Sequence, residues 1–192
     1  FRYPKSTNNV LNNVSIDIRL GETVGLVAKN GGGKTTLITA LLNGKKNTAF
    51  CFQEDCFWES LTVKDHLNFF AFQLVEADKG RVDELLAMLS LVECLDQQSS
   101  SLSGGQKRRF SFLLAFIRAE FDPRVSALVL DEATSGVDAQ GRRIMWNLIS
   151  SKKRDLSVLF TTHYLDEAAV LADRVCFLAN GSVVAMGTVM EL

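Results

Sequence analysis

Residues 27–36 read VAKNGGGKTT, and this stretch decides the fold. It follows Val24–Val27, an apolar run typical of a buried strand, and it leads into a helical pattern over Lys34–Asn43 that Gly44 ends. A strand, a glycine loop and a helix in this order bring backbone N–H groups and the positive end of a helix to one point. The stretch therefore predicts a phosphate-binding loop in an α/β fold.

The candidate phosphate-binding residues of this loop are Asn30, Gly31, Gly32, Gly33, Lys34, Thr35 and Thr36. In such a loop Lys34 reaches the β- and γ-phosphates and the hydroxyl of Thr35 binds Mg²⁺. The strict pattern has glycine where this chain has Ala28. Only a positive φ or a close backbone approach demands glycine, so we expect Ala28 to be tolerated if its φ is negative.

Composition and charge describe an ordinary globular protein. Of 192 residues, 47% are hydrophobic and 22% are charged, and the formal net charge is −1, which gives no reason to expect nucleic-acid binding. The most apolar run, Phe110–Ile117, is too short for a membrane helix. The four cysteines lack C-x-x-C spacing, which favours reduced thiols in the cytosol over a zinc site. We expect one domain over residues 1–192, and the start at Phe1 without a leader pattern indicates a piece of a longer protein.

Further strand and helix patterns follow along the chain. Val14–Leu20 alternates as in a half-buried strand, and strands are also expected at 125–130, 156–161, 175–178 and 183–186, with Asn180–Gly181 as the last hairpin turn. Helices are expected after a capping box at Thr62 and Asp65, and at 81–89, 105–117, 139–149 and 165–172. This order predicts a core of residues 1–57 and 121–192 with a helical subdomain, 58–120, inserted in it.

Residues 127–132 read ALVLDE, an apolar strand that ends in two acids. At the carboxyl end of a strand both side chains would face a bound nucleotide. Asp131 would then hold Mg²⁺ through water, and Glu132 would act as general base on the attacking water. Two acids after a strand are also a common surface feature, so this assignment depends on Lys34 upstream.

Residues 102–106 read LSGGQ, immediately before a predicted helix. With this third motif the chain resembles the nucleotide-binding domain of ABC transporters, whose motifs it carries in order over essentially all of its length. The resemblance implies the ABC ATPase fold, a P-loop NTPase core with a mainly parallel sheet and an inserted helical subdomain. It also implies ATP and Mg²⁺ as ligands, and ATP hydrolysis as the activity.

Three further residues take roles from the resemblance. Tyr3 stands where the family stacks an aromatic ring on adenine, although simple packing is the alternative. Gln53 stands where the family senses Mg²⁺ and the attacking water, with a solvated loop glutamine as the alternative. His163 stands where the family contacts the γ-phosphate, with a buried structural histidine as the alternative.

The resemblance also implies a second domain. In the family two domains pack head to tail, and the LSGGQ residues of one bind the γ-phosphate held by the other. The residues carried over to this role are Ser103, Gly104, Gly105, Gln106 and, in the following D-loop, Asp138. A domain by itself is therefore expected to hydrolyse ATP poorly.

Several stretches resemble the A subfamily, whose members are associated with lipid movement. They are 61–71 (LTVKDHLNFFA), Gly136–Asp138 with Arg142, Arg143 and Trp146, 164–168 (YLDEA) and 171–174 (LADR), and part of this likeness is also explained by core helix faces. Phe57 and Trp58 follow Gln53 where the family receives its membrane domains. We expect them to line a docking groove on the cytoplasmic face of a membrane, with core packing as the alternative.

One departure from the family concerns the interval from Lys34 to Gln53, which is too short for the usual antiparallel β-subdomain. Either residues are missing at Gly44–Thr48 or the hairpin was lost.

Two rival functions follow from the same motifs. One is a soluble ABC clamp acting on ribosomes or DNA, and the other is a degenerate domain that binds nucleotide and regulates a partner. The near-neutral charge disfavours the first, and the presence of Glu132 and His163 disfavours the second.

Overall fold

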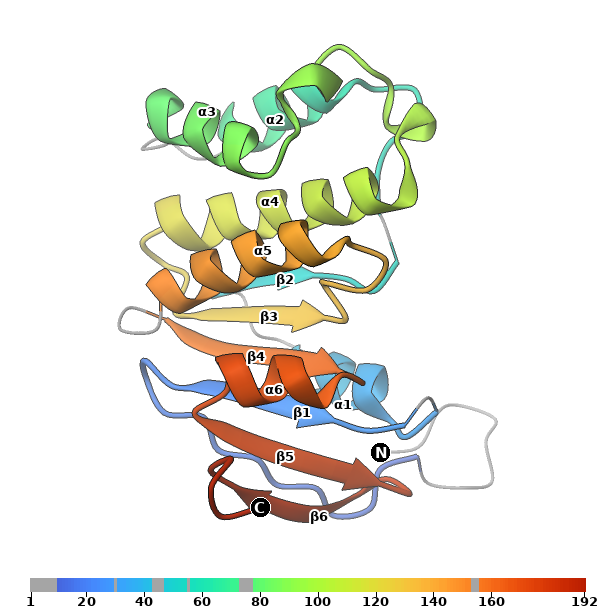
Figure 1. Ribbon diagram of the computed structural model, residues 1–192, viewed down its shortest axis with the longest axis vertical. Helices are drawn as coiled ribbons and strands as arrows, with labels where there is room; N and C mark the ends of the chain where they lie inside the picture. Colours follow the sequence, from blue (N-terminus) through green and yellow to red (C-terminus); the bar gives the residue numbers. More distant parts are fainter. Residues whose placement is uncertain (1–9, 30, 43–46, 55, 73–77, 153–155) are drawn as a thin grey trace.

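The computed structural model describes residues 10–29, 31–42, 47–54, 56–72, 78–152 and 156–192. In these residues six strands form one sheet in the order β2-β3-β4-β1-β5-β6 (Figure 1). Their bounds are β1 Thr23–Val27, β2 Thr48–Cys51, β3 Ala127–Asp131, β4 Ser157–Thr162, β5 Arg174–Ala179 and β6 Ser182–Gly187. Every neighbouring pair is parallel except β5 and β6, which confirms the mainly parallel sheet.

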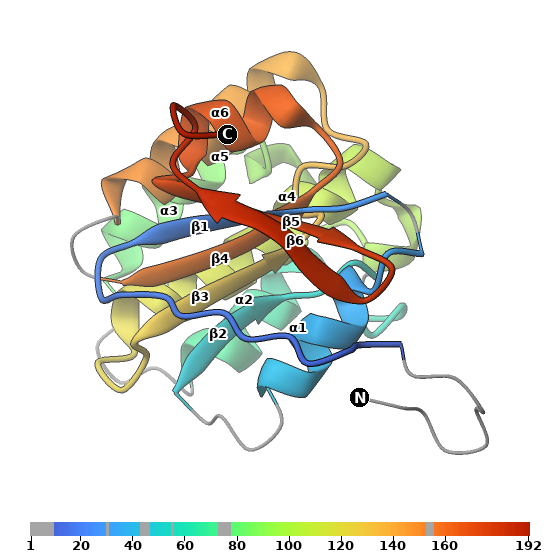
Figure 2. The ribbon, with the colours of Figure 1, turned by 90° about the horizontal axis from the view of Figure 1, so that it is seen from below.

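Helices cover both faces of the sheet (Figure 2). On one face lies α1 (Lys34–Leu42), and on the other lie α4 (Gly104–Phe121), α5 (Ala139–Ser151) and α6 (Leu165–Leu171). Beyond α4, away from the sheet, lie α2 (Val63–Phe72) and α3 (Lys79–Met88), followed by 3₁₀ turns at Val92–Cys94 and Ser99–Ser101. We retain residues 58–120 as a proposed helical subdomain, joined to the core through α4, which contacts both α3 and β2.

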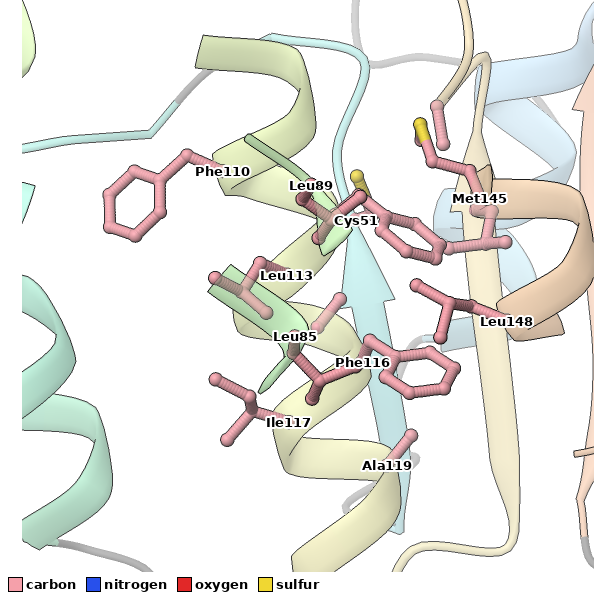
Figure 3. Packing of buried hydrophobic residues seen from close by; sticks show 14 of the residues in the cluster. Cys51, Leu85, Leu89, Phe110, Leu113, Phe116, Ile117, Ala119, Met145 and Leu148 are labelled. Carbon is pink, nitrogen blue, oxygen red and sulfur yellow. The ribbon is translucent and has the colours of Figure 1, made fainter. Parts of the chain in front are cut away.

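The largest hydrophobic cluster lies around α4 (Figure 3). Phe110, Leu113 and Phe116 of this helix are fully buried, because α3 covers one side of it and the sheet with α5 covers the other. A second cluster lies on the opposite face, between α1 and the sheet. Fully burying a large apolar side chain stabilises a fold by about 1.5–3 kcal/mol, so α4 anchors the helices to the core. Within the described residues no helix is long and apolar enough to cross a membrane.

Two local signals in the sequence are confirmed by hydrogen bonds. At the start of α2, the Asp65 N–H donates to the Thr62 hydroxyl over 3.1 Å, and the Thr62 N–H donates to the Asp65 carboxylate over 3.0 Å, which is a capping box. Between β5 and β6, Asn180 and Gly181 have φ of 51° and 73°. A two-residue turn with both φ positive matches the twist of the flanking strands.

Two expectations about strands are corrected. Val14–Leu20 is extended but not a strand, since in the described part of the chain it pairs with no ladder partner. Its alternation is real, because Val14, Ile16 and Ile18 pack on the cluster around α1 while the segment runs across that face of the sheet (Figure 2). Conversely, the sequence patterns do not predict β2, which is too short for alternation to be evident.

The hairpin turn also holds the beginning of the described chain. Asn12 N–H donates to the Gly181 carbonyl over 2.7 Å, and a Cβ on Gly181 would lie 2.1 Å from the Val10 carbonyl oxygen. Gly181 therefore has two reasons to be glycine, a positive φ and the close approach of another backbone.

Gly181→Ala is expected to lower the free energy of unfolding by about 1–3 kcal/mol, the usual cost of a strained backbone position. The matched control is Gly80→Ala in α3, where a new Cβ would meet Asp78 at an ordinary 3.4 Å. Urea unfolding of both variants measures the difference. Equal stability of the two variants would contradict the close packing of the turn on Val10.

Candidate functional site

The site lies at the carboxyl edge of the sheet, where β1, β3 and β4 end side by side. The glycine loop follows β1, Asp131 ends β3, and His163 follows β4. Beside these strand ends, the glycine loop, the start of α1, Gln53 after β2 and Glu132 after β3 surround a hollow of about 240 Å³. Its lining residues are Val10, Gly31, Gly32, Gly33, Lys34, Thr35, Thr36, Gln53 and Glu132. The sheet therefore gathers residues that are far apart in the sequence.

Lys34 is buried at the start of α1 and is held by two partners. Its Nζ donates to the Ala28 carbonyl over 3.0 Å and forms an ion pair with Glu132 Oε1 at 3.1 Å. Among the described non-glycine residues only Asn13, Ser90, Glu132 and Asn180 have a positive φ, so Ala28 does not. The condition under which Ala28 is expected to be tolerated is thus met, and the Ala28 carbonyl helps to aim Lys34 across the loop.

The glycines that follow are constrained differently. Gly31 and Gly33 have φ of 77° and 96°, in the left-handed region that favours glycine. A Cβ on Gly32 would lie 2.9 Å from the Lys29 carbonyl oxygen and 3.0 Å from the Ala28 Cβ. The methyl group of Ala28 thus makes glycine at position 32 more strictly necessary.

Three side chains whose oxygen atoms can bind a metal meet beside the loop. The Thr35 hydroxyl lies 2.9 Å from Asp131 Oδ2 and 3.3 Å from Gln53 Oε1. Asp131 Oδ1 accepts a further hydrogen bond from the Thr161 hydroxyl on β4, which fixes the carboxylate. A hydroxyl, a carboxylate and an amide oxygen are ligands that suit Mg²⁺, so Thr35, Asp131 and Gln53 fit the metal that the sequence predicts.

Glu132 stands between the lysine and the histidine. While Oε1 contacts Lys34, Oε2 lies 3.5 Å from His163 Nδ1. Its φ of 47° is unusual for a residue with a side chain and turns the carboxylate toward the hollow. The Glu132 N–H donates to the Thr161 hydroxyl over 2.9 Å, so Thr161 holds both acids. Sequence patterns do not identify Thr161. Its position two residues before His163, on the strand β4 that pairs with β3, is a signal by which it could have been found.

The LSGGQ residues lie elsewhere, at the beginning of α4. Ser103 caps this helix and forms a capping box with Gln106, and a Cβ on Gly105 would lie 3.3 Å from the Gly136 carbonyl oxygen. Asp138 caps α5 and accepts a hydrogen bond from the Gly141 N–H over 2.8 Å, which holds the pKa of its carboxyl below the usual range. Within the described residues, the LSGGQ and D-loop residues thus adjoin each other, and neither group lines the hollow.

Two residues predicted to bind the nucleotide, Tyr3 and Asn30, lie outside the described residues. Val10 does line the hollow, and no pattern in the sequence singles it out. It is brought there by Asn12, which the hairpin turn at Gly181 binds.

Comparisons with known proteins concern the family and the fold of the chain. A family model described as ABC transporter matches residues 43–135. The chain is 35% identical to the phospholipid-transporting ATPase ABCA3 of Mus musculus, and 34% identical to ABC transporter A family member 5 of Dictyostelium discoideum, in each case over 95% of its own length. It spans 12% of the length of these two relatives.

Solved structures share the fold. The ATP-binding subunit of an ABC transporter superposes with a TM-score of 0.84 at 22% identity, covering 97% of this chain and 86% of that one. A dimeric ATP-binding cassette in a post-hydrolysis state, bound to ADP and Pi, superposes with a TM-score of 0.82 at 19% identity, covering 98% and 94%. At such identities the likeness concerns the fold alone.

The packing of the glycine loop predicts different tolerance at its two small residues. Ala28→Gly is expected to change the dissociation constant for Mg²⁺·ATP by less than about threefold, since Ala28 is not strained. Gly32→Ala is expected to weaken binding by about tenfold or more because its Cβ displaces the loop. Combining both substitutions should recover part of that loss. Titration calorimetry on the three variants decides, and tenfold tighter binding by Ala28→Gly would refute the account of Ala28.

Proposed function

The chain belongs to the ABC transporter family, and we propose that it is an ATP-hydrolysing half-site that closes on a second such domain to drive transport. The observation that carries the proposal is the meeting of six residues at one edge of the sheet. They are Lys34, Thr35, Gln53, Asp131, Glu132 and His163. Each is a residue type suited to phosphoryl transfer to water. Thr35 contacts Asp131 and Gln53, and Glu132 contacts Lys34 and His163, with every contact distance at or below 3.5 Å.

The contacts of the site indicate how its residues act. The backbone amides of Gly31–Gly33 bind phosphate oxygens, and Lys34 exchanges its contact with Glu132 for the β- and γ-phosphates. Glu132, released from Lys34, orients the attacking water and accepts its proton. His163 lies on the other side of this carboxylate and orients the γ-phosphate. Thr35, Asp131 and Gln53 would hold Mg²⁺, which when bound would neutralise charge on the phosphates.

A second domain is needed because the LSGGQ residues do not reach the hollow of their own domain. Ser103 and Gly105 lie at the exposed beginning of α4, where backbone N–H groups and the helix dipole favour an anion. We propose that Ser103–Gln106 and Asp138 act on the nucleotide held by a second ABC ATPase domain, in the same or another chain. A dimeric cassette among the structures with the same fold supports this arrangement.

The proposed cargo is lipid, and the proposed location is the cytoplasmic face of a membrane. Support comes from the relatives, which include a phospholipid-transporting ATPase and A-family transporters. The longer protein would supply the membrane domains, because this chain spans a small part of such relatives.

The proposed contact with the membrane domains involves exposed aromatic rings. Trp58 is 51% exposed and Phe69 is 48% exposed, with ring centroids 5.1 Å apart. Phe57, by contrast, is half-buried and stacks on Phe110 at 5.0 Å, so it supports this surface from the core side. The docking surface is therefore assigned to Trp58 and Phe69, with Phe57 beneath it.

Glu132→Gln is expected to lower ATP hydrolysis by about 10² or more because the general base is lost. ATP affinity should be unchanged or higher, since Lys34 no longer forms an ion pair that nucleotide must replace. The control is Glu93→Gln, an exposed acid at the start of a 3₁₀ turn. Turnover assays and nucleotide titration measure both effects, and near-normal hydrolysis by Glu132→Gln would refute the general-base role.

Replacing Trp58 and Phe69 together by alanine, in the longer protein that carries this chain, is expected to abolish transport while ATP binding stays within about threefold, because these rings mark a contact surface. The exposed Val92→Ala serves as control. Lipid transfer and ATP binding are measured on the same preparations. Full transport by the double variant would reject the docking surface.

A further inference from the structure

Arg108 is a buried cation that neither the motifs nor the proposed function uses. It lies on α4, two residues after the last residue of LSGGQ, and it is 6% exposed. Its guanidinium donates hydrogen bonds to main-chain carbonyls in two distant segments. Nη1 binds the Phe52 carbonyl and, over 3.1 Å, the Gln53 carbonyl, while Nη2 binds the Asp131 carbonyl and Nε binds the Glu132 carbonyl over 3.1 Å.

These two segments carry the residues that, in the proposed function, would face Mg²⁺ and the attacking water. The first, after β2, holds Gln53, whose side chain lies 3.3 Å from the Thr35 hydroxyl. The second, at the end of β3, holds Asp131 and Glu132. One side chain therefore joins the loop of the metal-sensing glutamine to the turn of the general base, and it joins both to α4.

Arginine is the residue type suited to this task. Its planar guanidinium presents five N–H donors in a rigid fork, whereas a lysine ammonium is a single point with three donors on a flexible stem. Four carbonyls at separate positions require the fork. The backbone contacts also fix the direction of each segment, which side-chain contacts alone would leave free to turn.

We propose that Arg108 is a positioning residue for hydrolysis, which fixes Gln53 relative to Glu132 and couples both to the position of α4. This inference rests on the proposed ATPase function. Because α4 begins with the LSGGQ residues, a shift of this helix on contact with the second domain would move the hydrolytic residues of its own domain.

The test compares Arg108→Met with Lys107→Met, a neighbouring residue on the same helix. Both remove one positive charge, but within the described residues the Lys107 side chain forms no hydrogen bond or ion pair. For Arg108→Met we expect kcat to fall by about tenfold or more, as for small misplacements of catalytic groups, with the dissociation constant for ATP within about threefold of the parent value. Lys107→Met should change neither. Arg108→Lys should not restore kcat, because lysine lacks the fork.

Amide hydrogen exchange supplies a readout independent of turnover. In Arg108→Met, exchange should accelerate in residues 52–54 and 131–132 and stay unchanged in 31–36. If the methionine variant does not fold, Arg108→Lys is measured in the same way. Unchanged exchange in both hydrolytic segments, or an equal loss of ATP binding and kcat, would overturn the proposal. ATP binding without hydrolysis by the parent chain, measured with the second ABC ATPase domain present, would refute the proposed function, while the exchange data would still decide the role of Arg108.

A double-mutant cycle separates positioning from general destabilisation. If Arg108 acts through Gln53, combining Arg108→Met with Gln53→Ala should reduce kcat little more than Gln53→Ala alone. Fully multiplicative losses would mean that the two residues act independently, and would overturn the coupling.

Discussion

Parallel pairing of β1, β3 and β4 is the constraint on which the site depends. The ladders match Val27 with Thr162 and Asp131 with Thr161, so three strands end at the same level. The glycine loop, the two acids and His163 each follow one of these ends. A shift of one residue in either ladder would move every side chain of the strand to the opposite face of the sheet. The hydrophobic clusters on the two faces disfavour such a shift because it would expose buried apolar side chains. The cores on the two faces thus fix the geometry of the edge.

Lys34 and Glu132 contact each other at the hollow where we propose that the nucleotide binds. Both groups are largely buried, and removing one partner of a buried ion pair leaves an uncompensated charge. In the proposed function a bound phosphate would replace Glu132 as the partner of Lys34, so that binding would release the proposed general base. Nucleotide binding would therefore free the Glu132 carboxylate for hydrolysis without any large rearrangement of the core. The presence of Glu132 and His163 at this edge of the sheet also disfavours a degenerate domain that lacks the means of turnover.

Most of the fold follows from local sequence signals, whereas Gln53 and His163 are assigned to the site by the family resemblance. The strand, glycine loop and helix over 24–42, the capping box at Thr62 and the Asn180–Gly181 turn depend on residues close in sequence, and the structure confirms each of these elements. Sequence patterns fail where the deciding partner is remote. The alternation of Val14–Leu20 reports burial, but a strand also needs a neighbour.

Side-chain environment is the other source of error. Arg108 reads as one more charge in a basic helix, and only the fold shows that it is buried among carbonyls of two other segments. Phe57 and Trp58 are adjacent aromatic residues in the sequence, yet the first supports the core and the second is exposed. Likewise, the distance between the LSGGQ residues and the hollow of their own domain is a property of the fold that no local pattern contains.

A structure of the chain bound to Mg²⁺ and a non-hydrolysable ATP analogue tests the central claim most directly. The account predicts that Lys34 leaves Glu132 for the phosphate oxygens, that the metal binds Thr35 with Asp131 and Gln53 around it, and that Ser103 of a second domain reaches the γ-phosphate. Nucleotide bound away from residues 31–36, or bound there with the contact between Lys34 and Glu132 intact, would contradict it.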